Sequence, residues 1–429
     1  MSDGLFALVL HCHLPFVRHP EHEHFIEENW FFEAVTETYI PLLEMFEGLR
    51  RDDVDFRATL AFSPPLCRML TDELLQERCG RYIGERVELM ERELQARRNT
   101  PYENAARMYR DRFSHQAERY GNRAGERVLD GFQALQQEGP LRIITSAATH
   151  ALLPLLNTPE GTYAQVEQAC RAHEGLFGAR PEGIWLPECA YDKGVDEVLA
   201  RCGPQYFFLE SHGVLLADPT PQRGVFAPLI TPSGVAAFGR DIQSSQQVWS
   251  TDEGYPGDYE YREFYRDLGF DADEDDIEPY LHSPEGRHFL GIKYHRITGE
   301  VPMGEKEPYR PGRAAQRARE HAEHFVSERV RQVRELSCHL REKPLIVSTY
   351  DAELFGHWWF EGPQFLNAVF REMHERKQTG AAGGPVVEPT TPAEYMKRKP
   401  VLQEAIPAAS TWGYGGYYEV GVNGATDWI

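Results

Sequence analysis

The stretch of this chain that is richest in chemically competent side chains lies near residue 350. Residues 345–349 begin with Leu-Ile-Val, an apolar run that predicts a short buried β-strand. Two carboxylates, Asp351 and Glu353, come directly after it, and His357 and Trp358 follow. Carboxylates, an imidazole and indoles at the end of a strand are typical of a catalytic cleft that binds sugars. The alternative is a capped junction between a strand and a helix, with the aromatic side chains in the core.

A further carboxylate, Glu188, stands in a similar setting. The sequence Gly-Ile-Trp-Leu-Pro precedes it and predicts another short strand. Cleavage of a glycosidic bond needs two carboxyl groups, about 5–5.5 Å apart for retention and about 6.5–9.5 Å apart for inversion. Glu188 and Asp351 are 351 − 188 = 163 residues apart, so only the tertiary fold can bring them together. Glu353 either competes with Asp351 for the second role or caps the following helix.

Three histidines also lie at the ends of expected strands. His11 and His13 follow the first apolar run and point to the same side of a strand, and His150 follows the third expected strand. The chain contains no H-E-x-x-H or C-x-x-C motif, so hydrogen bonding to a ligand's hydroxyls is favoured over metal binding. Histidines satisfied within the core are the remaining alternative. Trp30, near the start of a helical pattern, is either a core anchor or an aromatic wall of a cleft.

Strands and helices alternate along most of the chain, which predicts an α/β barrel with its site at the carboxyl ends of the strands. The expected strands are residues 5–10, 56–62, 141–145, 183–186, 205–209, 289–293 and 345–349. Residues 72–138 have helical periodicity and many Arg and Glu residues, which predicts two or three inserted helices. Residues 223–299 are rich in Gly, Pro, Ser, Asp and aromatic residues, a composition typical of a lid or binding loop.

Composition narrows the class of protein. The 429 residues suffice for two or three domains or one large barrel, and no apolar run approaches the roughly 18 residues that span a bilayer. A formal net charge of −22 argues against nucleic acid as a partner. The N-terminal apolar run lacks a preceding basic region, so it predicts a strand and not a signal peptide. Seven scattered cysteines indicate free thiols in a reducing compartment, and we expect a cytoplasmic protein without a membrane partner.

Nine segments together resemble glycoside hydrolase family 57. They are LHCHLPFVRHPE (10–21), ENWFFEAVTETYIPLL (28–43), SAATHALLPLL (146–156), GIWLPECAYDKGVDEVL (183–199), PSGVAAFGRD (232–241), YREFYRDLGFD (261–271), IKYHRITG (292–299), YDAELFGHWWFEGP (350–363) and STWGYGGYYEV (410–420). The resemblance implies an α/β fold, an incomplete seven-stranded (β/α)7 barrel over residues 1–71 and 139–394. It also implies a helical insertion at 72–138 and only the start of a C-terminal helical region at 395–429.

The resemblance also implies an activity, 1,4-α-glucan branching by a retaining double displacement that needs no metal or cofactor. By motif match Glu188 is the nucleophile and Asp351 the proton donor and general acid/base, so their environments must push the two pKa values apart. The substrate is an α-glucan such as amylose, amylopectin or glycogen. The residues implied to bind it are His11, His13, Trp30, His150, Arg266, Gly286, Trp358 and Trp412.

Three alternatives stand beside branching. The same site would support α-amylase or 4-α-glucanotransferase activity. A non-catalytic relative that binds glucan would keep the barrel without turnover. A metal-dependent polysaccharide hydrolase or deacetylase would use His11 and His13.

The sequence departs from the family's pattern in two respects. Branching members usually continue beyond the residues DWI into a helical domain that closes the cleft, whereas this sequence ends at Ile429. We therefore expect either a second chain that completes the cleft or a short member of the family. The family's branching loop carries a tyrosine near its tip, and no tyrosine lies between Tyr206 and Tyr255. Either departure favours hydrolysis over transfer or abolishes activity.

Overall fold

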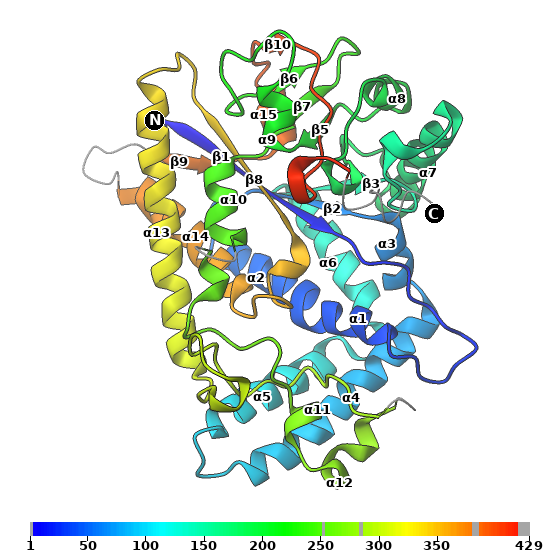
Figure 1. The fold of residues 1–429 in the computed structure, drawn as a ribbon, viewed down its shortest axis with the longest axis vertical. Coiled ribbons are helices and arrows are strands. Elements are labelled where there is room, and N and C mark those ends of the chain that lie inside the picture. Colours follow the sequence, from blue (N-terminus) through cyan, green and yellow to red (C-terminus); the bar gives the residue numbers. More distant parts are fainter. Residues whose placement is uncertain (1–2, 251–253, 283–285, 380–385, 419–429) are drawn as a thin grey trace.

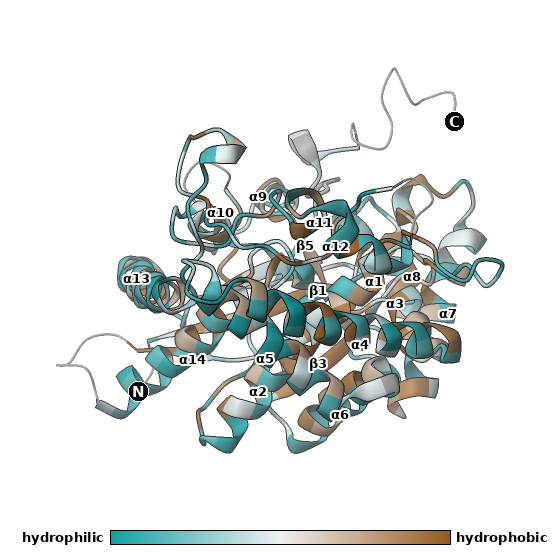
Figure 2. Cartoon of the chain, turned by 90° about the horizontal axis from the view of Figure 1, so that it is seen from below, coloured by the Kyte–Doolittle hydropathy of each residue, from teal (hydrophilic) through white to brown (hydrophobic). Residues whose placement is uncertain are grey.

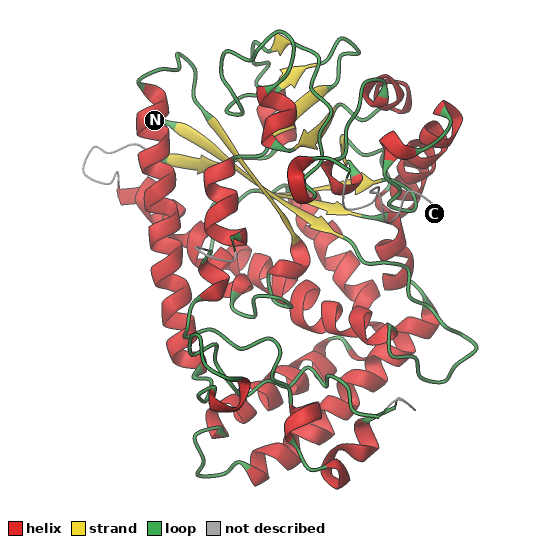
Figure 3. Cartoon of the chain, viewed as in Figure 1, coloured by secondary structure: helices red, strands yellow, loops and turns green. Residues whose placement is uncertain are grey.

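A computed structural model describes residues 3–250, 254–282, 286–379 and 386–418. A curled half-barrel sheet occupies one half of the molecule, and helices surround it and extend to the other end (Figure 1, Figure 3). The strands run in the order β10-β6-β7-β5-β4-β3-β2-β1-β8, with β9 beside β1, and every pair except β6 with β7 is parallel. They are β1 (Gly4–Cys12), β2 (Ala58–Phe62), β3 (Leu141–Ser146), β4 (Gly183–Trp185), β5 (Tyr206–Leu209), β6 (Leu229–Ile230), β7 (Ala236–Gly239), β8 (Leu345–Asp351), β9 (Val387–Pro389) and β10 (Gln403–Glu404).

Six of the seven strands expected from the sequence are present, and the expected strand at 289–293 is wrong. Leu290 and Ile292 are fully buried, which explains the apolar pattern, but the backbone there bonds to a side chain instead of a neighbouring strand. The carboxylate of Asp267 accepts the N–H groups of Leu290 at 2.8 Å and Gly291 at 3.0 Å. Four short strands, β6, β7, β9 and β10, were not expected from the sequence. Of these, β7 contributes to the interior of the sheet, and its four residues Ala-Ala-Phe-Gly are too few to be recognised as a strand.

Alternate residues of seven parallel strands pack together inside the curl of the sheet. Because side chains on a strand alternate between its two faces, each strand contributes every second residue. This interior cluster includes Leu5, Ala7 and Val9 of β1, Ala61 of β2, Ile144 of β3, Trp185 of β4, Tyr206 and Phe208 of β5, Ala236 and Phe238 of β7, and Leu345 and Val347 of β8. By the same alternation, every second residue near the carboxyl end of each strand also faces the interior.

Helices cover the outer face of the sheet. Figure 2 shows apolar strands in the middle of the molecule and hydrophilic outward turns on helices such as α13. The α-helices are α1 (Glu28–Glu33), α2 (Ile40–Arg51), α3 (Pro64–Leu70), α4 (Glu73–Ala96), α5 (Glu103–Arg119), α6 (Ala124–Glu138), α7 (Pro159–Phe177), α8 (Val195–Cys202), α9 (Ser211–Leu215), α10 (Ile242–Trp249), α11 (Leu268–Asp271), α12 (Glu274–Ile277), α13 (Pro311–Ser337), α14 (Gly362–Thr379) and α15 (Pro392–Lys397). Helices α4, α5 and α6 occupy the segment expected to be helical, with breaks near the expected positions.

Short helical turns connect these elements, and one of them is a π-helix. The turns are η1 (Ala34–Tyr39), η2 (Gly121–Arg123), η3 (Leu153–Leu155), η4 (Pro187–Cys189), η5 (Tyr255–Gly257), η6 (Glu278–Tyr280), η7 (Met303–Glu305), η8 (Ala352–Leu354) and η10 (Tyr414–Gly416). The π-helix is η1, which lies between α1 and α2 and is entirely buried. Single π-helical turns inside α-helices often accompany functional sites, and the contacts of η1 described below agree with this.

The last described segment lies against the sheet and crosses the carboxyl end of β4. β10 pairs with β6, and Tyr191 and Ser410 form an antiparallel bridge. Residues 419–429, which belong to the expected start of a C-terminal helical region, lie outside the described residues.

Candidate active site

Asp351 is the last residue of β8 and lies directly beside His11 of β1 in the register of the parallel pair. Burial raises the pKa of its carboxyl group to about 7, the negative charge of Glu188 adds to this rise, and the positive charge of Arg240 opposes it. Near neutral pH a large share of Asp351 therefore carries its proton, which is the state that a proton donor requires. The influence of Glu188 on this pKa shows that the fold brings the two carboxylates into one electrostatic environment.

Glu188 projects from the turn η4 directly after β4, and it is exposed. Its backbone has φ 55° and ψ 22°, and Cys189 has φ 49°, so two successive residues occupy the left-handed region at a cost of about 1–2 kcal/mol each. Trp412 holds the turn in place. Its indole Nε1 donates a hydrogen bond to Glu188 Oε2 at 3.0 Å, and its backbone N–H donates to the Glu188 carbonyl at 2.9 Å.

The three predicted histidines form one stack beside the carboxylates. The rings of His13 and His150 lie 3.6 Å apart between centroids, and His11 Nε2 is 2.8 Å from His150 Nε2. The ring of His11 also stacks on Trp185 at 4.8 Å. Burial lowers the pKa of His13 to about 4, and burial with the nearby His13 lowers that of His150 to about 3. The imidazoles are therefore neutral at pH 7, so each ring carries one N–H donor and one acceptor nitrogen.

Glu353 lies behind the histidines instead of facing the interior with Asp351. It is 7% exposed, and its Oε1 accepts hydrogen bonds from the Tyr39 hydroxyl and from the backbone N–H of His13, the latter at 3.2 Å. Burial raises its pKa to about 8, and the charge of Asp351 contributes. Glu353 therefore supports the backbone of His13 and the hydroxyl of Tyr39.

Arg240 belongs to this site, although the sequence assigned it no role. It follows β7 on the interior side, two residues after Phe238. Its guanidinium lies over the ring of Trp412 at 5.3 Å and bonds to Glu210 Oε2 at 2.9 Å. The only sequence feature that could have indicated Arg240 is its position directly after β7, and this strand was not expected from the sequence. Arg240 thus contacts Trp412, which holds Glu188, and its positive charge lowers the pKa of Asp351.

Arg240 gives a testable effect on the pH dependence of the reaction. A proton donor loses activity as pH rises through its pKa, so the alkaline limb of kcat/KM should fall near pH 7. Because the positive charge of Arg240 lowers the pKa of Asp351, Arg240→Met should move this limb to higher pH. Arg240→Lys keeps the charge and should leave the limb near its original position. A limb that stays in place or moves to lower pH in Arg240→Met would contradict the assignment.

The remaining predicted binding residues divide into two groups. Trp30 on α1 and Trp358 are 54% and 55% exposed, so both indoles are available for contact with a ligand, and Trp358 stacks on Phe264 at 4.6 Å. Arg266 instead pairs with Asp271 at 2.8 Å and with the Met303 carbonyl.

Gly286, like Arg266, makes its contacts within residues 260–305. It has φ +91°, and its carbonyl lies 3.5 Å from His288 Nδ1. Among the described residues, no hydrogen bond or ion pair joins Arg266 or Gly286 to the carboxylate pair.

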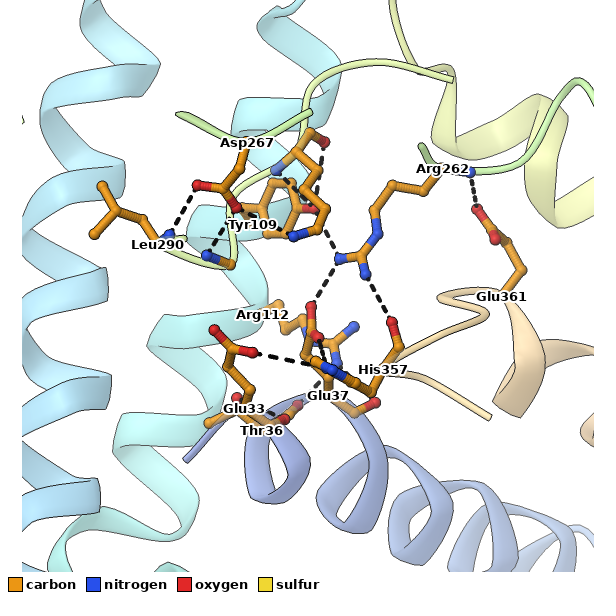
Figure 4. Close-up of polar contacts among 12 residues, drawn as sticks. Glu33, Thr36, Glu37, Tyr109, Arg112, Arg262, Asp267, Leu290, His357 and Glu361 are labelled. Atoms are coloured by element: carbon orange, nitrogen blue, oxygen red, sulfur yellow. Dashed lines mark hydrogen bonds and ion pairs between the residues drawn. The ribbon is translucent and has the colours of Figure 1, made fainter. Parts of the chain in front are cut away.

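A buried ionic network supports the loop that carries Trp358. Arg262 donates to Glu37 Oε1 of η1 at 2.7 Å and to the His357 carbonyl at 3.2 Å, and His357 Nδ1 lies 2.8 Å from Glu37 Oε2 (Figure 4). Burial alone would raise the pKa of Glu37, but Arg262 and His357 hold it well below its usual range. Gly356 has φ +120°, and a Cβ there would lie 1.9 Å from the Glu37 carbonyl oxygen, so only glycine fits this close approach.

No group of three or more His, Cys, Asp or Glu side chains in the described part of the chain is arranged to hold a metal ion. None of the helices described combines the length and the apolar character needed to cross a bilayer. All seven cysteines are unpaired, and six of them are buried.

Comparison with known proteins identifies the class to which this fold and site belong. Glycosyl hydrolase family 57 matches residues 7–406, and the chain therefore belongs to this family. The chain is similar to the α-amylase AmyC from Thermotoga maritima, with 42% identity and a TM-score of 0.88 over 96% of this chain and 78% of that one. It is also similar to the branching enzyme of this family from Pyrococcus horikoshii, with 32% identity and a TM-score of 0.84 over 99% and 76% of the two chains.

A curated relative is similar over nearly the whole of this chain. The chain is 35% identical to the 1,4-alpha-glucan branching enzyme of Thermococcus kodakarensis over 455 aligned residues, which cover 99% of this chain. The match spans 62% of that enzyme's length.

Proposed function

We propose that this chain is a retaining enzyme of α-glucan metabolism and that its activity is 1,4-α-glucan branching. The observation that carries the proposal is the pairing of an exposed Glu188, held by Trp412, with an Asp351 whose pKa is raised to about 7. Two carboxyl groups in such different environments suit a nucleophile and a proton donor. Close similarity to branching enzymes over nearly the whole chain supports the choice of reaction.

The proposed reaction has two steps. Glu188 attacks the anomeric carbon of an α-1,4-linked glucosyl unit while Asp351 gives its proton to the leaving glycosidic oxygen, so a covalent glycosyl-enzyme forms and the shortened chain departs. In the second step Asp351, now a carboxylate, takes the proton from the 6-hydroxyl of an acceptor glucan. That oxygen attacks the anomeric carbon, an α-1,6 bond forms, and Glu188 is released as a carboxylate.

The supporting residues have roles in this proposal that follow from their positions. The neutral imidazoles of His11, His13 and His150 bind hydroxyls of the reacting glucose. Trp30, Trp358 and Trp412 are stacking walls, and Arg266 and Gly286 bind substrate from the 260–305 segment. Branching requires exclusion of water after the first step. Within residues 223–299 the strands β6 and β7 belong to the sheet, so the proposed lid is the part of this segment that follows α10.

The proposal extends to architecture and location. Residues 1–71 and 139–394 form a catalytic (β/α)7 barrel, 72–138 a helical insertion and 395–429 the start of a helical region. Two observations support the barrel: seven parallel strands share one interior cluster, and the Asp241 N–H after β7 donates to the Val347 carbonyl of β8 at 2.9 Å. The unpaired cysteines fit a cytoplasmic enzyme of glycogen-like glucan synthesis.

Hydrolysis of α-glucan is the second candidate function. It is favoured by the 42% identity to the α-amylase AmyC and by the lack of a tyrosine between residues 206 and 255. Incubation with amylose separates the two, since NMR spectra show α-1,6 anomeric protons and a reducing-sugar assay counts hydrolysed bonds. Branching predicts that new α-1,6 linkages outnumber new reducing ends, whereas hydrolysis predicts reducing ends without α-1,6 linkages.

A further inference from the structure

A groove of about 500 Å³ opens along helix α10, next to Arg240 of the candidate active site. This volume falls within the about 300–1,000 Å³ that is usual for small-ligand sites. Its lining includes Ile242, Gln246 and Trp249, which follow one another at helical spacing and form one stripe of α10. Ile242 and Trp249 are 44% and 53% exposed, so this stripe presents apolar surface to solvent and not to the core.

Helix α10 is firmly attached on its other side, so the groove wall has a fixed position. Asp241 caps the helix by accepting the Ser244 N–H at 2.8 Å, and it also accepts a hydrogen bond from Gln332 of α13 at 2.7 Å. Gln243 donates to Glu328 of α13 at 3.3 Å. The exposed indole of Trp249 therefore belongs to a helix that is positioned by contacts independent of the groove.

The groove also has a polar part, which it shares with the candidate active site. Arg240 and Glu210 line it, with Arg240 Nε bonded to Ser245 Oγ at 2.7 Å and Nη1 to Glu210 Oε2 at 2.9 Å. Within the described chain these bonds leave Nη2 of Arg240 available to donate to a hydroxyl. The same guanidinium lies over Trp412, which is bonded to Glu188, so Arg240 connects the lining of the groove to the residue that holds Glu188.

We propose that this groove is a subsite for a glucosyl unit of the α-glucan chain beyond those held at the carboxylates. One face of the sugar ring stacks on Trp249, while hydroxyls at its edge bond to Arg240, Glu210 and Gln246. An aromatic platform opposite a few polar groups suits a sugar, which has apolar C–H faces and a polar rim. This inference rests on the proposed function, because it takes the α-glucan as the ligand.

Binding in an inactive background tests the subsite directly. Glu188→Gln protein is titrated calorimetrically with maltoheptaose and with maltotriose, with and without Trp249→Ala. We expect Trp249→Ala to weaken maltoheptaose binding by about three- to tenfold, as loss of one aromatic contact predicts, and to change maltotriose binding little. In the active protein, kcat/KM for amylose should fall while turnover of maltotriose persists.

Two further variants control for damage to the helix. Trp249→Phe keeps an aromatic platform and should recover most of the maltoheptaose affinity. Gln247→Ala lies on the same helix outside the groove and should bind like the parent protein. Unchanged maltoheptaose affinity in Trp249→Ala, or an equal loss for both oligosaccharides, would overturn the subsite. Failure of the parent protein to bind or convert any α-glucan would instead overturn the proposed function.

Discussion

Replacement of Glu188 by Gln or Asp351 by Asn should each lower turnover of amylose by at least about 10³-fold while leaving the protein folded. Glu188 is exposed, and both substitutions keep the shape of the side chain. In the proposed reaction, loss of Glu188 removes the nucleophile, and loss of Asp351 removes the proton for the leaving oxygen. Circular dichroism and thermal unfolding establish the fold, and a reducing-sugar or linkage assay gives the rate.

The two roles are distinguished by the leaving group. An aryl maltoside with a good leaving group needs no protonation, so Asp351→Asn should still release the aryl alcohol, whereas Glu188→Gln should not. Glu353→Gln is the matched control, because Glu353 is buried behind His13 and its amide replacement keeps an acceptor for Tyr39. A loss in Glu353→Gln as large as in Asp351→Asn, or full amylose turnover in either carboxylate variant, would refute the assignment.

Asp351→Asn also has a predicted effect on the pH dependence of stability. The pKa of Asp351 in the folded protein is raised to about 7 from an unfolded value near 3.8, so the folded state binds more protons and stability falls as pH rises between these values. Asp351→Asn abolishes this loss. The melting temperature of Asp351→Asn minus that of the parent protein should therefore increase from pH 4 to pH 8.

Substitution of Arg262 by Met should lower the free energy of unfolding by about 3–5 kcal/mol, because it leaves the buried carboxylate of Glu37 without its guanidinium partner. Urea unfolding followed by tryptophan fluorescence measures the change. Activity should fall as well, since Arg262 also bonds to the backbone of His357 beside Trp358.

A double variant separates the lost charge from lost packing. In Arg262→Met with Glu37→Gln no unpaired buried carboxylate remains, so part of the stability should return. Arg331→Met on the exposed face of α13 is the surface control and should change stability by less than about 0.5 kcal/mol. A loss below about 1 kcal/mol in Arg262→Met would show that the network is not required for the fold.

The sequence predicted those parts of the site that lie on long apolar strands. β1 and β8 have continuous apolar runs, so the positions of His11 and Asp351 at their carboxyl ends followed directly. Glu188 was found because an apolar tripeptide and a proline precede it. The left-handed backbone that presents Glu188 could not be predicted, because it depends on Trp412, which lies 412 − 188 = 224 residues further along the chain.

The misassigned strand and the overlooked arginine have a common cause. Residues 289–293 are as apolar as a buried strand, but Asp267 satisfies their backbone donors, and only the tertiary structure shows this. Arg240 follows a strand of only four residues, and its importance comes from contacts with Glu210 and Trp412 that local periodicity does not contain. Periodicity along the chain predicts strands and helices. It does not predict side chains that take the place of a neighbouring strand or that connect two elements.

The pairing of His11 with Asp351 has a consequence for synthesis of the protein. These neighbours in adjacent strands are 351 − 11 = 340 residues apart in the chain. At about 5–20 residues per second, a ribosome needs roughly 20 to 70 seconds to make β8 after β1 has been translated. During that interval one edge of the most apolar strand of the protein lacks its partner. We therefore expect the unpaired edge of β1 to be open to pairing with other chains until β8 has been made, and slow codons between residues 62 and 345 would prolong this exposure to aggregation.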